Sequence, residues 1–276
     1  MEGFQVLLVI LLGAVAGGMG ALLGLGGGVF LVPLLTWLLD LPVQQAAGIS
    51  LLTVIATSGA VSTGSEAKRY VNLRLGMLLM VCTSLGGLAG GLTAQRLSER
   101  TLTLLFALTT AAIALVTLSR LDQRNVSEDV TLEPNWLGGR FKDPDCICDV
   151  VYSVRRVPLA LGISFVAGNI SGLLGVGGGV LQVPALSAWC GVPIRVAAAT
   201  SAFLLGITAL ASAPLYYAHG YVDAHLAAAG VLGVLGGSTT GMRWGAKRQG
   251  RELKMLLAAL LIVVSVMMFI RLAGLS

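Results

Sequence analysis

Two glycine-rich stretches combine residue types that can present backbone amides to an anion. Residues 21–33 read ALLGLGGGVFLVP, and residues 172–184 read GLLGVGGGVLQVP. In each, three successive glycines are followed five residues later by Pro33 or Pro184. Because glycine and proline both disfavour a helix interior, this spacing predicts a broken helix. A break exposes helix N-terminal amides, whose partial positive charge attracts anions. The stretches therefore predict an anion site built from backbone.

A few polar side chains accompany these breaks. Asn169 and Gln182 flank the second break, and a primary amide is costly in lipid without partners. Ser50 and Ser201 occupy equivalent places in the following apolar segments, although serine and threonine often hydrogen-bond their own helix. We expect positive φ angles at Gly27 and Gly178. The candidate substrate-binding residues are Gly26, Gly27, Gly28, Ser50, Asn169, Gly177, Gly178, Gly179, Gln182, Thr200 and Ser201.

The apolar segments show no pattern of charged residues that could bind or transfer protons. No Asp, Glu, Lys, Arg or His falls in the central part of any of them, so the sequence predicts no buried proton relay. The glycines lack the strand and the acidic partner of a dinucleotide site. His219, Asp223 and His225 are interpreted as solvated residues rather than a metal site. We expect no catalytic residue, no metal and no cofactor, and transport that responds to voltage more than to a pH gradient.

The elements that hold these residues must lie in a membrane. Of 276 residues, 56% are hydrophobic and 11% charged, and the mean hydropathy is +0.88, which predicts an all-α polytopic membrane protein. The first segment begins with an acidic residue, so we interpret it as a retained span rather than a signal peptide. The net charge of +5 comes from basic residues scattered among the loops, so no nucleic-acid partner is expected.

The chain is an internal duplication. Residues 22–33 match residues 173–184 at nine of twelve positions, and further matches continue without a gap at an offset of 151. Residues 1–120 and 156–276 are therefore predicted to be two transmembrane repeats, joined by a linker at 121–155. Each divides into five segments: 4–22, 25–39, 43–63, 75–95 and 101–119, then 157–174, 177–190, 194–218, 226–242 and 253–270.

The second segment of each repeat is short. About 22 Å of helix does not cross a hydrocarbon core of about 30 Å, so the first two segments are expected to form a hairpin or a broken, re-entrant helix. With ten segments, alternate loops divide the lysines and arginines fifteen to three. Cytoplasmic loops are rich in these residues, so both termini are predicted outside the inner membrane. Because five is odd, the repeats must be inverted.

Other glycines and the cysteines have simpler interpretations. Gly86, Gly87, Gly90 and Gly91 are expected to let helices pack closely, and we expect Gly90→Ala to transport almost normally. Cys146 and Cys148, in the polar cytoplasmic linker, form a C-x-C pattern that suits either free thiols or a soft metal or redox role.

Two other functions remain open from the residues. Cys82 and Cys190 are the cysteines of the apolar segments, so a membrane thiol-redox protein is the main alternative to a carrier. A passive scaffold is another. The oligomeric state is not indicated.

The repeated turns GLGGGVFLVP and GVGGGVLQVP, followed by PVQQAAGISL and PIRVAAATSA, resemble the TauE/SafE (sulfite exporter) family of membrane transporters. The resemblance extends over nearly the whole chain outside 121–155. It implies a secondary carrier or exporter of small anions such as sulfite, sulfoacetate or a related organosulfur compound, by alternating access between the repeats. Ile49 stands where the second repeat has Thr200, which departs from the family's usual Thr-Ser pair.

Overall fold

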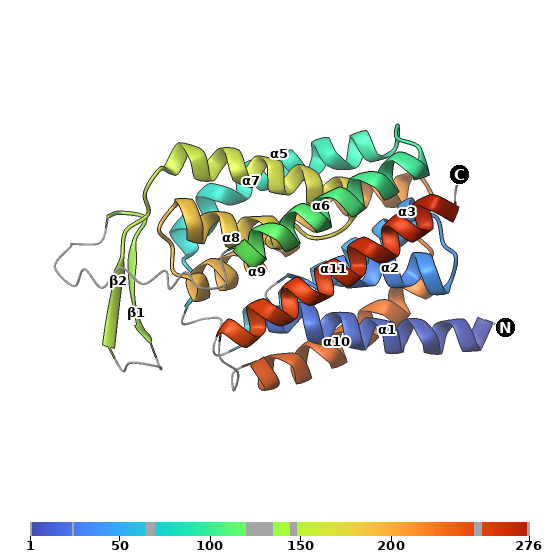
Figure 1. The fold of residues 1–276 in the computed structure, drawn as a ribbon, viewed down its shortest axis with the longest axis horizontal. Helices are drawn as coiled ribbons and strands as arrows, with labels where there is room; N and C mark the ends of the chain where they lie inside the picture. The colour runs from blue at the N-terminus through green and yellow to red at the C-terminus, as the bar shows by residue number, and fades with distance from the viewer. Residues whose placement is uncertain are drawn as a thin grey trace.

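The computed structural model describes residues 2–23, 25–64, 70–119, 135–143, 148–245 and 250–274. Within them the chain forms ten helices and one two-stranded antiparallel sheet (Figure 1). The elements are α1 (Glu2–Leu23), α2 (Gly28–Leu38), α3 (Val43–Thr63), α5 (Leu73–Ala94), α6 (Glu99–Ser119), β1 (Gly139–Asp143), β2 (Cys148–Tyr152), α7 (Val157–Leu174), α8 (Gly179–Trp189), α9 (Ile194–Ala218), α10 (Ala224–Gly245) and α11 (Gly250–Gly274).

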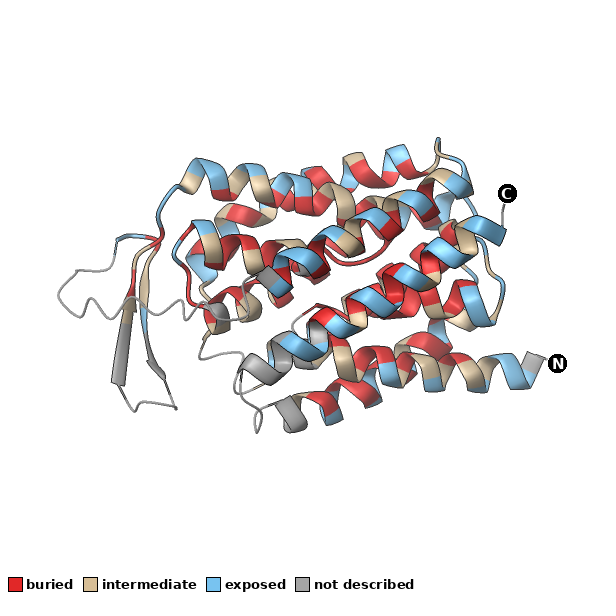
Figure 2. Ribbon diagram, in the orientation of Figure 1, coloured by how far each residue is buried: buried red, intermediate tan, exposed pale blue. Residues whose placement is uncertain are grey.

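The outside of the bundle is apolar. Six of the described helices are long and apolar enough to cross a membrane: α1, α3, α5, α6, α7 and α9. On α1, Phe4, Leu7, Leu11 and Val15 are exposed about one turn apart, whereas buried residues gather between the helices (Figure 2). Soluble proteins rarely expose apolar surface on this scale. The prediction of an all-α polytopic membrane protein is confirmed.

The two halves of the chain are interlocked. α1 packs along α10, and α7 packs along α5, while α3 pairs with α9 and α6 with α11. Each of these pairs joins a helix before the linker to a helix after it. Replacing each helix by its counterpart 151 positions away converts the α1–α10 pair into the α7–α5 pair. The packing therefore has the symmetry expected of a duplicated chain.

The short helices turn back along their predecessors. In the second half, the side chain of Gln182 in α8 reaches Ser164 in α7. The N–H of Arg155, just before α7, donates to the carbonyl of Cys190, just after α8, at 2.9 Å. A Cβ built on Gly178 would lie 2.8 Å from the carbonyl oxygen of Ala167, and one on Gly27 would lie 2.9 Å from that of Ala16. Both breaks are therefore helical hairpins.

The hairpins enter the bundle from opposite ends. α1 begins at the end where both termini lie, whereas α7 begins at the other end, beside β2 (Figure 1). This arrangement is the one that an inverted repeat produces, because the second copy runs upside-down relative to the first. The short helices α2 and α8, with eleven residues each, are about 16 Å long and return toward the ends from which their hairpins started.

Glycines allow the close approach of α5 to α7 and of α1 to α10. A Cβ on Gly86 would collide with the carbonyl oxygen of Phe165, and one on Gly237 with that of Ala14. The packing interpretation of this glycine group is confirmed at Gly86 and at Gly90. The expectation that Gly90→Ala is harmless is not supported, because the carbonyl oxygen of Asn169 occupies the space that the methyl group needs.

Part of the linker packs against the bundle. β1 and β2 pair in register from Gly139 opposite Tyr152 to Asp143 opposite Cys148. Asn72, the N-cap of α5, donates its Nδ2 to the carbonyl of Leu137 at 2.7 Å and to the Tyr152 hydroxyl at 2.9 Å. Burial raises the pKa of the Tyr152 phenol and outweighs the lowering effect of the Asn72 hydrogen bond. The linker was expected to be a polar loop that could order as a small hairpin, and its described part forms a β-hairpin docked on the bundle.

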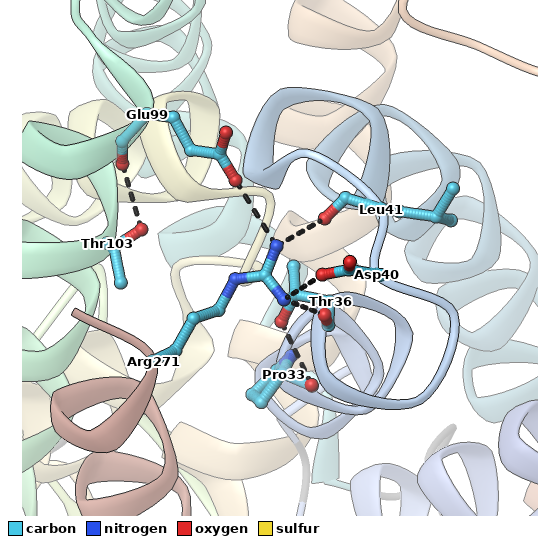
Figure 3. A network of polar contacts seen from close by, with 7 residues as sticks. All are labelled: Pro33, Thr36, Asp40, Leu41, Glu99, Thr103 and Arg271. Atoms are coloured by element: carbon cyan, nitrogen blue, oxygen red, sulfur yellow. Dashed lines mark hydrogen bonds and ion pairs between the residues drawn. The ribbon is translucent and has the colours of Figure 1, made fainter. Parts of the chain in front are cut away.

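Arg271, in the last turn of α11, joins three segments at the opposite end of the bundle (Figure 3). Its guanidinium donates to the carbonyls of Thr36 and Leu41, and it forms ion pairs of 3.3 Å with Asp40 and Glu99. The Arg271 side chain is 12% exposed, whereas that of Asp40 is 95% exposed. The carbonyl contacts therefore contribute more than the exposed ion pair.

Replacing Arg271 by Gln is expected to lower the free energy of unfolding by about 1 kcal/mol, since the amide reaches fewer of these acceptors. The thermal unfolding midpoint of the purified protein in detergent measures the effect. Arg100→Gln is the matched control, because Arg100 is exposed at the same end. Equal midpoints for the two variants would mean that the Arg271 contacts add no stability.

Candidate functional site

The glycine turns adopt the left-handed backbone that glycine permits, but not at every predicted position. Gly26 and Gly27 both have a φ of 76°, and Gly177 has a φ of 73°. Gly178 has a φ of −62°, so the expectation of a positive angle there is wrong. In the second hairpin the left-handed residues are Gly175, which ends α7 by donating its N–H to the carbonyl of Ser171, and Gly177.

The two hairpin tips meet inside the bundle. A Cβ built on Gly28 would lie 2.6 Å from the carbonyl oxygen of Gly175, which also accepts a 2.6 Å hydrogen bond from Ser50 Oγ. The structure thus brings Ser50, from the first half, onto the tip of the second hairpin. Only glycine fits at Gly28 without a backbone shift.

Two apolar side chains lie between the tips. Val54 and Leu205 occupy equivalent positions in α3 and α9. Cβ atoms built on Gly26 and Gly177 would lie 3.0 to 3.4 Å from these side chains. The tips and this apolar pair therefore leave no open passage at their point of contact.

Both short helices begin at these tips without a side-chain cap. Gly27 is the N-cap of α2 and Gly178 is the N-cap of α8, and neither position supplies a capping hydrogen bond from a side chain. The first amides of a helix have no partner within the helix, and the helix dipole makes this end electropositive. Two such ends inside an apolar bundle can together attract an anion.

A buried polar cluster lies beside the second tip. Gln182 Nε2 donates to Ser164 Oγ at 3.1 Å, and Ser201 Oγ donates to Gln182 Oε1 at 3.2 Å. All three residues are almost completely buried. The structure therefore connects two of the predicted site residues, Gln182 and Ser201, through a direct hydrogen bond.

Two predicted site residues, Asn169 and Thr200, make other contacts than those of the Gln182 cluster. Asn169 is half-buried, and its main chain packs against Gly86 and Gly90 of α5. Thr200 Oγ1 accepts a 3.0 Å hydrogen bond from the N–H of Asn72, which places it at the junction with the linker. No described hydrogen bond joins either residue to Gln182.

Sequence reasoning did not select three residues of this region. Ser164 and Ser171 lie seven residues apart on α7, a spacing that puts them on one helix face and that is readable in the sequence. The hydroxyl of Tyr216, on α9, donates to the carbonyls of Gly172 and Leu173 at 2.8 and 3.0 Å. No sequence pattern predicts that contact, because it depends on how α9 crosses α7.

At the linker end, a cavity of about 280 Å³ opens between the β-hairpin and the bundle. Asn72, Tyr152 and the two arginines Arg74 and Arg140 line it. Arg74 also donates to the carbonyl of Trp136 at 3.3 Å. This end of the protein therefore carries positive charge around an open depression.

The cysteines do not form a redox pair among the described residues. Cys82 and Cys190 are both free, Cys82 half-buried in α5 and Cys190 buried at the end of α8. Cys146 lies outside the described residues, and Cys148 lies in β2.

Apolar spanning helices around two hairpins with inward-facing helix ends characterise a multi-pass membrane transporter. The model of the sulfite exporter TauE/SafE family matches residues 9–268, so the chain belongs to that family. It is therefore a transporter and not an enzyme.

Two curated relatives are similar over nearly their full lengths. The chain is 28% identical to the probable membrane transporter protein YunE of Bacillus subtilis (strain 168), over 93% of this chain and 94% of the relative. It is 25% identical to the probable membrane transporter protein MJ0441 of Methanocaldococcus jannaschii, over 95% of each. No solved structure matches the chain.

Proposed function

We propose that this transporter carries small anions, with sulfite or a related organosulfur anion as substrate, past a site at the two hairpin tips. The observation that carries the proposal is the pair of uncapped helix N-termini, of α2 and α8, at tips that touch. The name of the family supports sulfite as a substrate.

The charges of the described residues support an anion held by dipoles. Among these residues, every buried polar side chain of the bundle is neutral. A cation would find no carboxylate there, whereas an anion would meet helix amides, hydroxyl groups and the Gln182 amide. The same absence of buried acids supports transport driven by voltage rather than by protons.

Alternating access would act on the contact between the tips. Val54 and Leu205 close the space beside Gly26 and Gly177, so a substrate could reach the site only when one hairpin moves away from this pair. The inverted arrangement of the hairpins supports this mechanism, because the same rearrangement can open the site first toward one end and then toward the other.

A flux assay tests the proposal. Purified protein in liposomes should carry sulfite or short organosulfonates faster than empty liposomes, and an imposed voltage should change the rate for a substrate of fixed charge more than a pH gradient does. Lack of flux for every anion tried would refute an anion carrier. Strong acceleration by a proton gradient at zero voltage would instead refute the proposed dependence of transport on voltage rather than on protons.

The orientation is a further part of the proposal. The α5–α6 and α9–α10 loops lie at the end of the bundle that holds both termini (Figure 1), and their sequences contain Ser98 and His219. The fifteen-to-three division of basic residues supports placing that end outside. Ser98→Cys and His219→Cys, in a cysteine-free background, should react with an impermeant thiol reagent added outside the cell. Ser127→Cys and Gln249→Cys, which lie outside the described residues, should react only after permeabilisation. Labelling of Ser98→Cys and Ser127→Cys from one side would contradict this topology.

A further inference from the structure

The cavity between the β-hairpin and the bundle is basic. Arg74, in the first turn of α5, and Arg140, in β1, both line it, and no acidic residue is among its described lining residues. Within the described part of the chain, Arg74 makes one hydrogen bond, to the carbonyl of Trp136, and neither guanidinium pairs with a carboxylate. Two arginines without counter-ions attract an anion, and each guanidinium can donate to two oxygens of one phosphate group.

The wall of this cavity is built by Asn72. Its backbone N–H donates to Thr200 Oγ1, its Nδ2 donates to the carbonyl of Leu137 and to the hydroxyl of Tyr152, and its Oδ1 accepts from the N–H of Leu75. These contacts join α5, α9 and the β-hairpin. The two elements that carry the arginines are therefore held together by the protein itself, and a ligand meets a preformed site.

The cavity lies at the end of an apolar stripe on α5. This helix is long and apolar enough to cross a membrane, and its first residue, Leu73, lines the cavity. Leu73, Met77, Val81 and Leu85 are four residues apart and each is more than half exposed, so they share one outer face of the helix. On a membrane-spanning helix such a face contacts acyl chains. The cavity is therefore at the level where this helix leaves the hydrocarbon core.

Trp136 is an exposed aromatic residue at the same level. Its side chain is 73% exposed, and its carbonyl accepts the hydrogen bond from Arg74. Tryptophan is enriched at membrane–water interfaces. β1 and β2 run across this end of the bundle (Figure 1), so the hairpin places Arg140 beyond the first turn of α5. Basic pockets at the ends of membrane helices suit the headgroups of anionic lipids.

We propose that the cavity binds an anionic phospholipid, with the phosphate of the headgroup between Arg74 and Arg140 and the acyl chains along the exposed stripe of α5. The two guanidinium groups favour a lipid with net negative charge over a zwitterionic one, whose cationic group they repel. In this position the lipid joins α5 to the β-hairpin and stabilises the docked linker. The inference concerns a site at the end of the bundle and is independent of which anion the protein transports.

Thermal unfolding of the purified full-length protein in detergent, titrated with lipid, tests the site. Phosphatidylglycerol should raise the unfolding midpoint in a saturable way, because it binds the folded protein. Phosphatidylcholine with the same acyl chains should not. Glycerol phosphate at the same concentration should have little effect, since it lacks the chains that contact α5. An equal rise with both lipids would indicate an unspecific lipid shell, and an equal rise with glycerol phosphate would indicate a soluble phosphate ligand; either result would overturn the proposal.

Variants of the two arginines locate the headgroup. Arg74→Gln and Arg140→Gln should each raise the half-saturating concentration of phosphatidylglycerol about tenfold, since each removes a charged hydrogen-bond donor. Arg140 is exposed, so Arg140→Gln should unfold at the wild-type midpoint when no lipid is added. Arg155→Gln is the matched control, because Arg155 is exposed at the same end of the bundle and does not line the cavity. Wild-type half-saturation in Arg140→Gln, or an equal loss in Arg155→Gln, would overturn the cavity as the lipid site.

Discussion

Gly177→Ala is expected to reduce anion flux about tenfold or more, a loss equivalent to one hydrogen bond to a charged group. The φ of 73° at Gly177 is costly for alanine, so the peptide groups before α8 should rotate and turn their amides away from the site. The new methyl group would meet the flexible Leu205 side chain at 3.2 Å, so the fold should persist. Initial flux in liposomes, at matched protein content, measures the effect.

Gly220→Ala separates this loss from backbone strain. Gly220 has the same φ of 73°, and a Cβ there meets nothing within 4 Å. Both variants should therefore lose a similar amount of stability, about 1 kcal/mol, while only Gly177→Ala loses transport. If the two variants transport equally well, the second tip does not bind the substrate.

Gly237→Ala is expected to lower the free energy of unfolding by about 3 kcal/mol. The added methyl group would collide with the carbonyl oxygen of Ala14, and a backbone oxygen cannot move aside by changing a rotamer. α1 and α10 would have to separate along their whole contact. A lower thermal unfolding midpoint, or a lower yield of protein after membrane extraction, reports this effect.

The neighbouring residue provides the control. A Cβ on Gly236 meets nothing within 4 Å, so Gly236→Ala should gain up to about 1 kcal/mol of helix propensity. The two substitutions are chemically identical and one position apart. Destabilisation by both would mean that the close contact between α1 and α10 is not what limits stability here.

The two chain breaks that form the site were predictable because the same sequence pattern occurs in both halves. Matching prolines and glycine triplets indicated two breaks, and the short second segments indicated that the chain turns back there. The sequence could not predict which glycine takes the left-handed conformation. Gly27 and Gly178 are each the N-cap of a helix that begins at the next residue, yet only Gly27 has a positive φ, so the repeated sequence does not determine this angle.

The side-chain contacts of the site were less predictable. Gln182 and Ser201 were chosen because polar residues are rare beside the breaks, and the structure joins them. Thr200, one residue from Ser201, points instead to Asn72, because adjacent helix positions are about 100° apart. Ser164 enters the cluster through a helix-to-helix contact, and such contacts depend on how two segments cross rather than on either segment alone.

The pairing of α1 with α10 also sets the order in which the protein can be assembled. α10 begins at Ala224, 201 positions after α1 ends at Leu23. At a synthesis rate of about 5 to 20 residues per second, α1 leaves the ribosome about 10 to 40 seconds before its partner exists. During that interval its glycine face contacts lipid or the insertion machinery. The first half of the protein therefore reaches its final packing only after translation is nearly complete.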